Sequence, residues 1–121
     1  MRWEPLADRV FAYRIPFCDV TVGLIVGSAG VVLIDTATTL TEAHAIAADA
    51  VDLAGRTVTH VVLTHNHFDH ITGFSVFAGA VTYCAPAVVA TMADRKQHLR
   101  ADAVAHGADP VEMDRALAAL R

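Results

Sequence analysis

Hydrophobic residues with a two-residue period, rich in valine and isoleucine, fill the first third of the chain and predict β-strands. Residues 9–15 alternate between two faces in this way, and Pro16 ends the pattern. Two further apolar runs, Val20–Val26 and residues 31–35, flank a segment at 27–30 whose glycines are typical of a tight turn. The pattern therefore predicts one strand followed by a β-hairpin.

The next segment changes to a helical period. Thr39 and Glu42 have the spacing of a capping box, in which each side chain accepts a hydrogen bond from the other residue's backbone N–H. The helix predicted after Thr39 runs to about Ala54 and ends at Gly55, a residue type that favours the left-handed conformation found at helix ends.

A second set of strands and helices follows. Residues 58–64 form a strand with a continuous apolar run, typical of a strand covered on both faces, and residues 81–84 form another. Proline is favoured at the first position of a helix, so Pro86 predicts a helix that extends past Leu99, and Pro110 predicts a second one. This order of elements predicts a mixed α/β fold with an antiparallel start and a later β-α-β crossover.

The composition and charge of the chain argue against several classes of protein. The chain has 121 residues, of which 55% are hydrophobic and 18% charged, so a disordered chain is excluded and a single domain over residues 1–121 is expected. The net charge is −4 and no cluster of lysine and arginine occurs, which argues against nucleic acid or an anionic membrane as a partner. Glycines and Pro86 interrupt the uncharged stretch at 70–93, which argues against a membrane span. With no export signal recognised, we expect a cytoplasmic protein.

The candidate chemistry lies directly after the strand predicted at 58–64. His65, His67, Asp69 and His70 place four metal-binding side chains within six residues. Imidazole nitrogens and a carboxylate oxygen suit Zn²⁺, with Fe or Mn as alternatives. In an extended segment residues i and i+2 point the same way, so His65 and His67 can bind one ion together. A turn after them would direct Asp69 and His70 toward a second ion, and two adjacent ions can activate a bridging water.

A plain structural interpretation competes with this one. In it, Asp69 caps a short helix and the histidines of the loop are solvated. The metal-site interpretation is favoured because the segment follows a core strand, where α/β folds place their sites. His98 and His106 fall in a polar stretch and are interpreted as surface residues. No phosphate-binding or dinucleotide fingerprint occurs, so no nucleotide cofactor is expected.

The segment Thr64-His65-Asn66-His67-Phe68-Asp69-His70, followed by Ile71-Thr72-Gly73, resembles the T-H-x-H-x-D-H-x-x-G signature of the metallo-β-lactamase superfamily. The upstream strand that ends in Asp35-Thr36 resembles the first motif of that family. The resemblance implies a zinc-dependent hydrolase that acts on a small-molecule substrate through a metal-bound hydroxide. It implies the first half of an αββα sandwich, a mixed sheet flanked by helices.

Residue roles also follow from the resemblance. It implies that His65 and His67 bind the first of two zinc ions, and that Asp69 and His70 bind the second. Asp69 would in addition act in catalysis by orienting the attacking water. Asp35 would brace the metal loop. Apart from the resemblance, the hydroxyl of Thr64 has two interpretations: it hydrogen-bonds a ligand, or Thr64 simply packs as an ordinary strand residue.

The resemblance also implies that the domain is incomplete. Family members are about twice this length, and their second half supplies the remaining metal ligands. Two ligands per ion is one fewer than catalytic zinc sites normally use. The alternative to an enzyme is therefore a non-catalytic truncated fragment, or a metal-binding half-domain that a homodimer or a complementing chain would complete.

Overall fold

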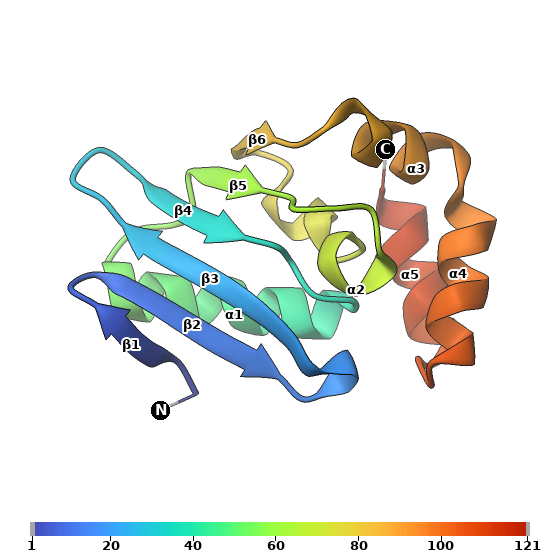
Figure 1. Cartoon of the computed structure of the whole chain (residues 1–121), viewed down its shortest axis with the longest axis horizontal. Helices are drawn as coiled ribbons and strands as arrows, with labels where there is room; N and C mark the ends of the chain where they lie inside the picture. The colour runs from blue at the N-terminus through green and yellow to red at the C-terminus, as the bar shows by residue number, and fades with distance from the viewer. Residues whose placement is uncertain (1, 121) are drawn as a thin grey trace.

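Six strands form one sheet in the order in which they occur in the sequence. In the computed structural model, which describes residues 2–120, strands β1 to β4 pair antiparallel, and β4, β5 and β6 pair parallel. Helix α1 connects β4 to β5 behind the sheet, and helices α3 to α5 lie together beside one end of it (Figure 1). The predicted mixed α/β class, with an antiparallel start and a parallel crossover, is confirmed.

The elements have the following bounds. The strands are β1 Glu4–Ala7, β2 Val10–Ile15, β3 Val20–Val26, β4 Val31–Ile34, β5 His60–Val62 and β6 Val81–Tyr83. The α-helices are α1 Leu40–Ala54, α2 Phe68–Ile71, α3 Pro86–Asp94, α4 Lys96–Ala105 and α5 Pro110–Ala119. Two 3₁₀ helices complete the chain, η1 Phe17–Asp19 and η2 Phe74–Phe77.

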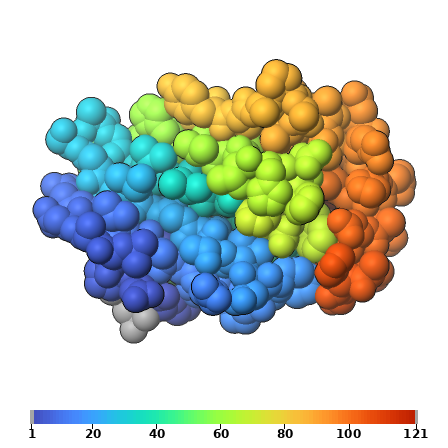
Figure 2. Space-filling view, viewed as in Figure 1, coloured from blue at the N-terminus to red at the C-terminus, as the bar shows by residue number. Residues whose placement is uncertain are grey.

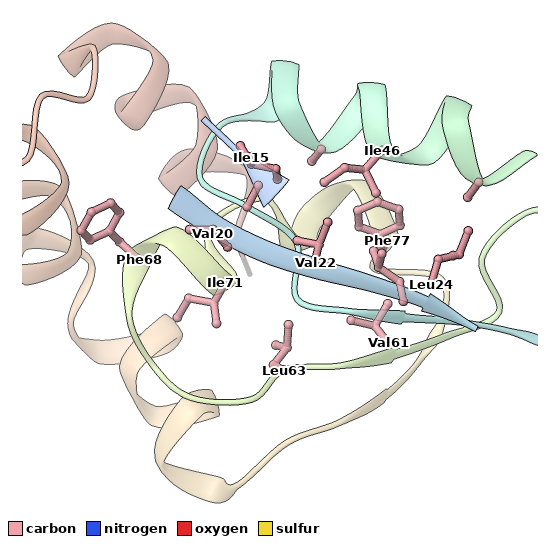
Figure 3. Packing of buried hydrophobic residues seen from close by; sticks show 14 of the residues in the cluster. Ile15, Val20, Val22, Leu24, Ile46, Val61, Leu63, Phe68, Ile71 and Phe77 are labelled. Carbon is pink, nitrogen blue, oxygen red and sulfur yellow. The ribbon is translucent and has the colours of Figure 1, made fainter. Parts of the chain in front are cut away.

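The core lies between the sheet and α1. Even-numbered residues of β3 are buried and odd-numbered ones are half-buried or exposed, as the two-residue period of a strand requires. On α1, Ala43, Ile46 and Ala50 share one buried face because they are three and four residues apart. Figure 3 shows Ile46 and Phe77 directed into this core, where Leu24 and Val61 of the sheet also lie.

The ends of α1 are as the sequence predicts. Thr39 accepts a hydrogen bond from the backbone N–H of Glu42, whose side chain accepts one from the backbone of Thr39, so the capping box is present. Gly55 closes the helix with φ 72°, in the left-handed region. These local signals fix where α1 begins and ends, and hence where the loop between β4 and α1 lies.

Three elements differ clearly from the prediction. Strand β1 was not predicted, because all of its residues are exposed and it contains a proline. Strand β5 has three residues, His60–Val62, rather than the seven of 58–64. The helix predicted to pass Leu99 is divided at Arg95, whose φ of −122° and ψ of 32° separate α3 from α4.

One face of the sheet has no helix against it among residues 2–120, and we call it the open face. Strand register places the following residues of β2 to β6 on it, together with Arg14 and Thr21: Val10, Ala12, Gly23, Ile25, Val32, Ile34, His60, Val62, Val81 and Tyr83. Figure 2 views the molecule from this side, with α1 behind. The apolar run at 61–63 predicts cover on both faces, whereas Val62 is half-buried here. No helix within residues 2–120 is long and apolar enough to cross a membrane.

Candidate metal centre

The predicted metal ligands lie where β5 leaves the sheet. Leu63 is buried and anchors the end of the strand, and its N–H donates to the carbonyl of Tyr83 on β6. The chain then turns through residues 64–67 into the short helix α2, which starts at Phe68. This loop lies between the sheet and the group of helices α3 to α5 (Figure 1).

The structure brings the four predicted ligands together. The rings of His65 and His67 have centroids 4.7 Å apart, and those of His65 and His70 are 4.1 Å apart. Nε2 of His70 lies 3.8 Å from a carboxylate oxygen of Asp69. His67 is exposed and the other three side chains are half-buried, so the cluster opens to solvent on one side.

Asp35 lies beneath this cluster and contacts two parts of the loop. Its Oδ1 accepts from the backbone N–H of Thr64 at 2.9 Å, and its Oδ2 accepts from the hydroxyl of Thr64 at 2.8 Å. The same Oδ2 lies 2.6 Å from Nδ1 of His70. Asp35 is 2% exposed and has φ 66°, a conformation that costs a non-glycine residue about 1 kcal/mol and that is concentrated at functional sites.

These contacts determine which ring nitrogen of His65 and of His70 is available to bind a metal ion. Because the Thr64 hydroxyl donates its proton to Asp35, it accepts from Nδ1–H of His65 at 2.8 Å. Nδ1–H of His70 likewise donates to Asp35. Both rings therefore carry a proton on Nδ1, so in the neutral form of each ring Nε2 keeps the lone pair that a metal ion needs. A metal-binding histidine is held in this way by a partner on its other nitrogen.

The backbone of α2 is held by the loop between β4 and α1. The carbonyl of His70 accepts from both the N–H and the hydroxyl of Thr36, at 2.9 and 3.0 Å. The hydroxyl of Thr72 is fully buried and bonds the carbonyl of Thr38. Gly73 fits here because a Cβ at this position would lie 2.4 Å from the carbonyl oxygen of Thr36. The backbone around His70 is thus fixed as firmly as its ring.

Electrostatics favours a neutral His65. Burial lowers the pKa of this ring, and the neighbouring rings of His70 and His67 lower it further. A neutral imidazole is the form that binds a metal ion. Burial, and next the carboxylate of Asp69, raise the pKa of the Cys18 thiol, so Cys18 is not an activated nucleophile.

The side-chain types of the cluster suit a metal ion, but residues 2–120 hold no complete set of ligands for one. Within residues 2–120, no three His, Cys, Asp or Glu side chains are arranged to hold one ion. The ring distances do not divide the four side chains into two separate pairs, because His65 lies closer to His70 than to His67. Catalytic zinc sites use three protein ligands, so each ion would need more than is present here.

Several residues that support this loop were not predicted from the sequence. The amide of Asn66 donates to the hydroxyl of Thr91 on α3 at 3.1 Å, and Thr36 and Thr72 bond the backbone of α2. The cluster of threonines at 36–39 was the available signal, since runs of hydroxyl residues bond nearby backbone groups. Asn66 and Thr91 are 25 residues apart, so no pattern in the nearby sequence indicates that they are in contact.

The two downstream histidines lie outside the cluster. His98 is exposed on α4. His106 is exposed and follows the same helix, with its ring centroid 5.5 Å from that of Phe68 and its Nδ1 2.8 Å from the carbonyl of Asp102. The structure thus places both on the surface, as expected from the sequence.

Comparisons with known proteins agree on one family. A family model described as the metallo-beta-lactamase superfamily matches residues 15–117. A sequence comparison with curated proteins gives no match. The fold is similar to the crystal structures of metallo-beta-lactamases from Erythrobacter litoralis, at 23% identity and a TM-score of 0.62, and from Hirschia baltica, at 20% and 0.63. A third, from Pseudomonas aeruginosa in a mono-zinc form, has 18% identity and a TM-score of 0.55.

These matches cover unequal shares of the two chains. The alignments include 74%, 77% and 74% of this chain, but only 43%, 47% and 43% of the three solved proteins. The chain therefore spans less than half the length of these similar proteins. Identities below 25% establish the fold alone, and the site residues rest on the geometry described above.

Proposed function

Because the chain belongs to the metallo-beta-lactamase superfamily, we propose that it supplies the metal-binding half of a zinc-dependent hydrolase. His65 and His67 are the proposed ligands of one ion, and Asp69 and His70 of a second. The substrate is a small molecule whose carbonyl or phosphoryl centre is attacked by water.

The observation that carries the proposal is the contact network of Asp35. A single buried carboxylate receives the hydroxyl of Thr64 and Nδ1–H of His70, and the hydroxyl of Thr64 in turn receives Nδ1–H of His65. A solvated surface loop has no need for such support. The network orients two rings and leaves both Nε2 atoms available, as ligation requires.

The residues have distinct roles in the proposed site. Bound zinc would supply Lewis-acid polarisation of the substrate and a water that ionises near neutral pH. Asp69 would bind one ion through a carboxylate oxygen and hold the attacking water by a hydrogen bond. Asp35 and Thr64 would keep the rings of His65 and His70 in place. His67, whose side chain is exposed, would bind the first ion together with His65.

The remaining ligands are proposed to come from a further segment of protein. The similar solved proteins are more than twice as long as the segment they share with this chain. We propose that residues 1–121 form an incomplete domain, whose site is completed by additional chain or by a partner that supplies the missing ligands. The alternative is a binding half-domain with no activity of its own, and metal binding without turnover would identify it.

The test measures metal binding and folding together. The purified chain is titrated with Co²⁺, a spectroscopic substitute for Zn²⁺, and its visible absorption and circular dichroism are recorded. We expect up to two ions per chain, and loss of the first ion and its share of the absorption in a His65→Ala, His67→Ala double variant that remains folded. A folded wild-type chain that shows no cobalt absorption would overturn the site assignment. Chromogenic lactam, lactone, thioester and phosphodiester substrates then separate an enzyme from a binding half-domain.

A further inference from the structure

A second support of the metal loop comes from helix α3. Asn66, between His65 and His67, donates its side-chain amide to Oγ1 of Thr91 at 3.1 Å. Thr91 lies on the buried face of α3 and is 8% exposed. The bond therefore joins the segment between two proposed ligands to a helix that begins 20 residues later in the sequence.

The direction of this bond is fixed by a third residue. The hydroxyl of Thr91 has one proton, and it donates that proton to the carbonyl of Ala87 at 2.8 Å. Thr91 can then only accept from Asn66. The amide must present its NH₂ group to the helix, which defines the orientation of Asn66. Because the buried hydroxyl of Thr91 both donates one hydrogen bond and accepts another, it holds the amide of Asn66 in one orientation.

The geometry of the loop connects this bond to the ligands. The rings of His65 and His67 are on the same side, with centroids 4.7 Å apart, whereas Asn66 reaches across to α3. The turn through residues 64–67 thus directs the two rings to each other and the side chain of Asn66 to the helix. Fixing Asn66 therefore limits the backbone rotation that would separate the two rings.

We propose that Thr91 is a positioning residue for the metal site and acts through Asn66 on the pair His65 and His67. This inference rests on the proposed function, because it takes the two histidines as ligands of one ion. Asp35 holds the rings of His65 and His70 from below, and Thr91 holds the turn between His65 and His67 from the helical side. One support directly follows β4 and the other lies on α3, and both contact the same loop.

Conservative variants separate this role from a merely structural one. In Thr91→Val the shape is kept and the acceptor is lost, whereas Thr91→Ser keeps the hydroxyl. Asn66→Ala removes the donor at an exposed residue, so it tests the bond even if Thr91→Val destabilises α3. Thr82→Val is the matched control, since the hydroxyl of Thr82 bonds only the nearby carbonyl of Ala80 among the described contacts.

The measurement is cobalt affinity, with the visible spectrum and the urea midpoint of the metal-free protein recorded alongside. We expect Thr91→Val and Asn66→Ala each to weaken binding about tenfold, as loss of an outer partner of a ligand does. Thr91→Ser and Thr82→Val should bind as the wild type does. The Thr91→Val, Asn66→Ala double variant should lose no more than either single variant, because both remove one bond.

The outcomes distinguish this inference from the proposed function. Wild-type affinity in both Thr91→Val and Asn66→Ala overturns the inference alone. Additive losses in the double variant also overturn it, because the two residues would then act separately. A folded wild-type chain that binds no cobalt, or a His67→Ala variant that binds as well as the wild type, overturns the proposed function and the inference together.

Discussion

The carboxylate of Asp35 and the imidazole of His70, 35 residues apart in the sequence, lie 2.6 Å apart in the fold. The parallel pairing of β4 with β5 creates this proximity, because it brings the carboxyl ends of both strands to the same edge of the sheet. Asp35 follows β4 directly, and the loop with the proposed ligands follows β5. The site is therefore a consequence of the sheet topology as much as of the histidine-rich segment.

Removing Asp35 should reduce both stability and metal affinity. In Asp35→Ala, the N–H and hydroxyl of Thr64 and Nδ1–H of His70 lose their acceptor, so we expect the free energy of unfolding to fall by about 3 kcal/mol. Metal affinity should fall about 10- to 100-fold. Asp35→Asn accepts the positive φ and retains an amide oxygen, so it should lose affinity with a smaller loss of stability. Urea unfolding and cobalt titration measure the two effects, and wild-type affinity in Asp35→Ala would contradict the proposed support.

His67→Ala should remove binding of the first of the two proposed ions while leaving the fold unchanged. His67 is exposed, and a surface substitution of this kind changes the free energy of unfolding by less than about 0.5 kcal/mol. His98→Ala, at an exposed histidine on α4, is the matched control and should retain full binding. Cobalt absorption at equal circular dichroism provides the comparison. Equal loss in both variants would indicate non-specific binding by surface histidines.

Local signals in the sequence predicted the elements whose ends depend on nearby residues. The capping box of Thr39 and Glu42, the left-handed Gly55 and the hairpin of β3 and β4 all follow from short-range chemistry. The proposed ligands were identified in the same way, because they fall within six residues. Asp35 was identified only through resemblance to a family, since its partners lie in a distant segment.

The features missed from the sequence depend on tertiary contacts. Strand β1 is wholly exposed, so no hydrophobic alternation marks it, and it forms only because β2 offers a free edge. The break between α3 and α4 at Arg95 interrupts a continuous helical pattern without a glycine or proline. Thr91 resembles any helical threonine until its contact with Asn66 is known. Long-range partners of this kind have no local signature.

Gly73→Ala should destabilise the protein and disturb the site. The added Cβ would lie 2.4 Å from the carbonyl oxygen of Thr36 and 2.9 Å from Cβ of Ala43, so the backbone must move. Overpacking of this kind costs about 1–3 kcal/mol. Gly79→Ala is the control, because nothing lies within 4 Å of its added Cβ. In urea unfolding, only Gly73→Ala should shift the midpoint downward, and equal midpoints would show that the loop between β4 and α1 yields easily.

His65 should titrate below its ordinary pKa of 6.5 in the metal-free protein, because burial and the neighbouring imidazoles disfavour its charged form. The unfolded chain then binds more protons at this residue than the folded chain does. The stability contributed by His65 is therefore present above about pH 6.5 and is lost as the pH falls. Chemical-shift titration of the ring measures this pKa directly. His65→Gln should weaken the pH dependence of unfolding, whereas His44→Gln, at an exposed position on α1, should not.

The open face of the sheet should make the 121-residue chain self-associate. Ile25 on β3 is 38% exposed, and register places it beside Val10 and Val32 in an aliphatic surface. Contiguous apolar surface of this kind favours association because contact removes it from water. Ile25→Lys should shift the chain toward monomer in sedimentation experiments across a concentration series. Val111→Lys introduces the same charge at a residue on α5 that is 64% exposed, and it should leave association unchanged. Equal effects of the two lysines would attribute association to net charge rather than to the open face.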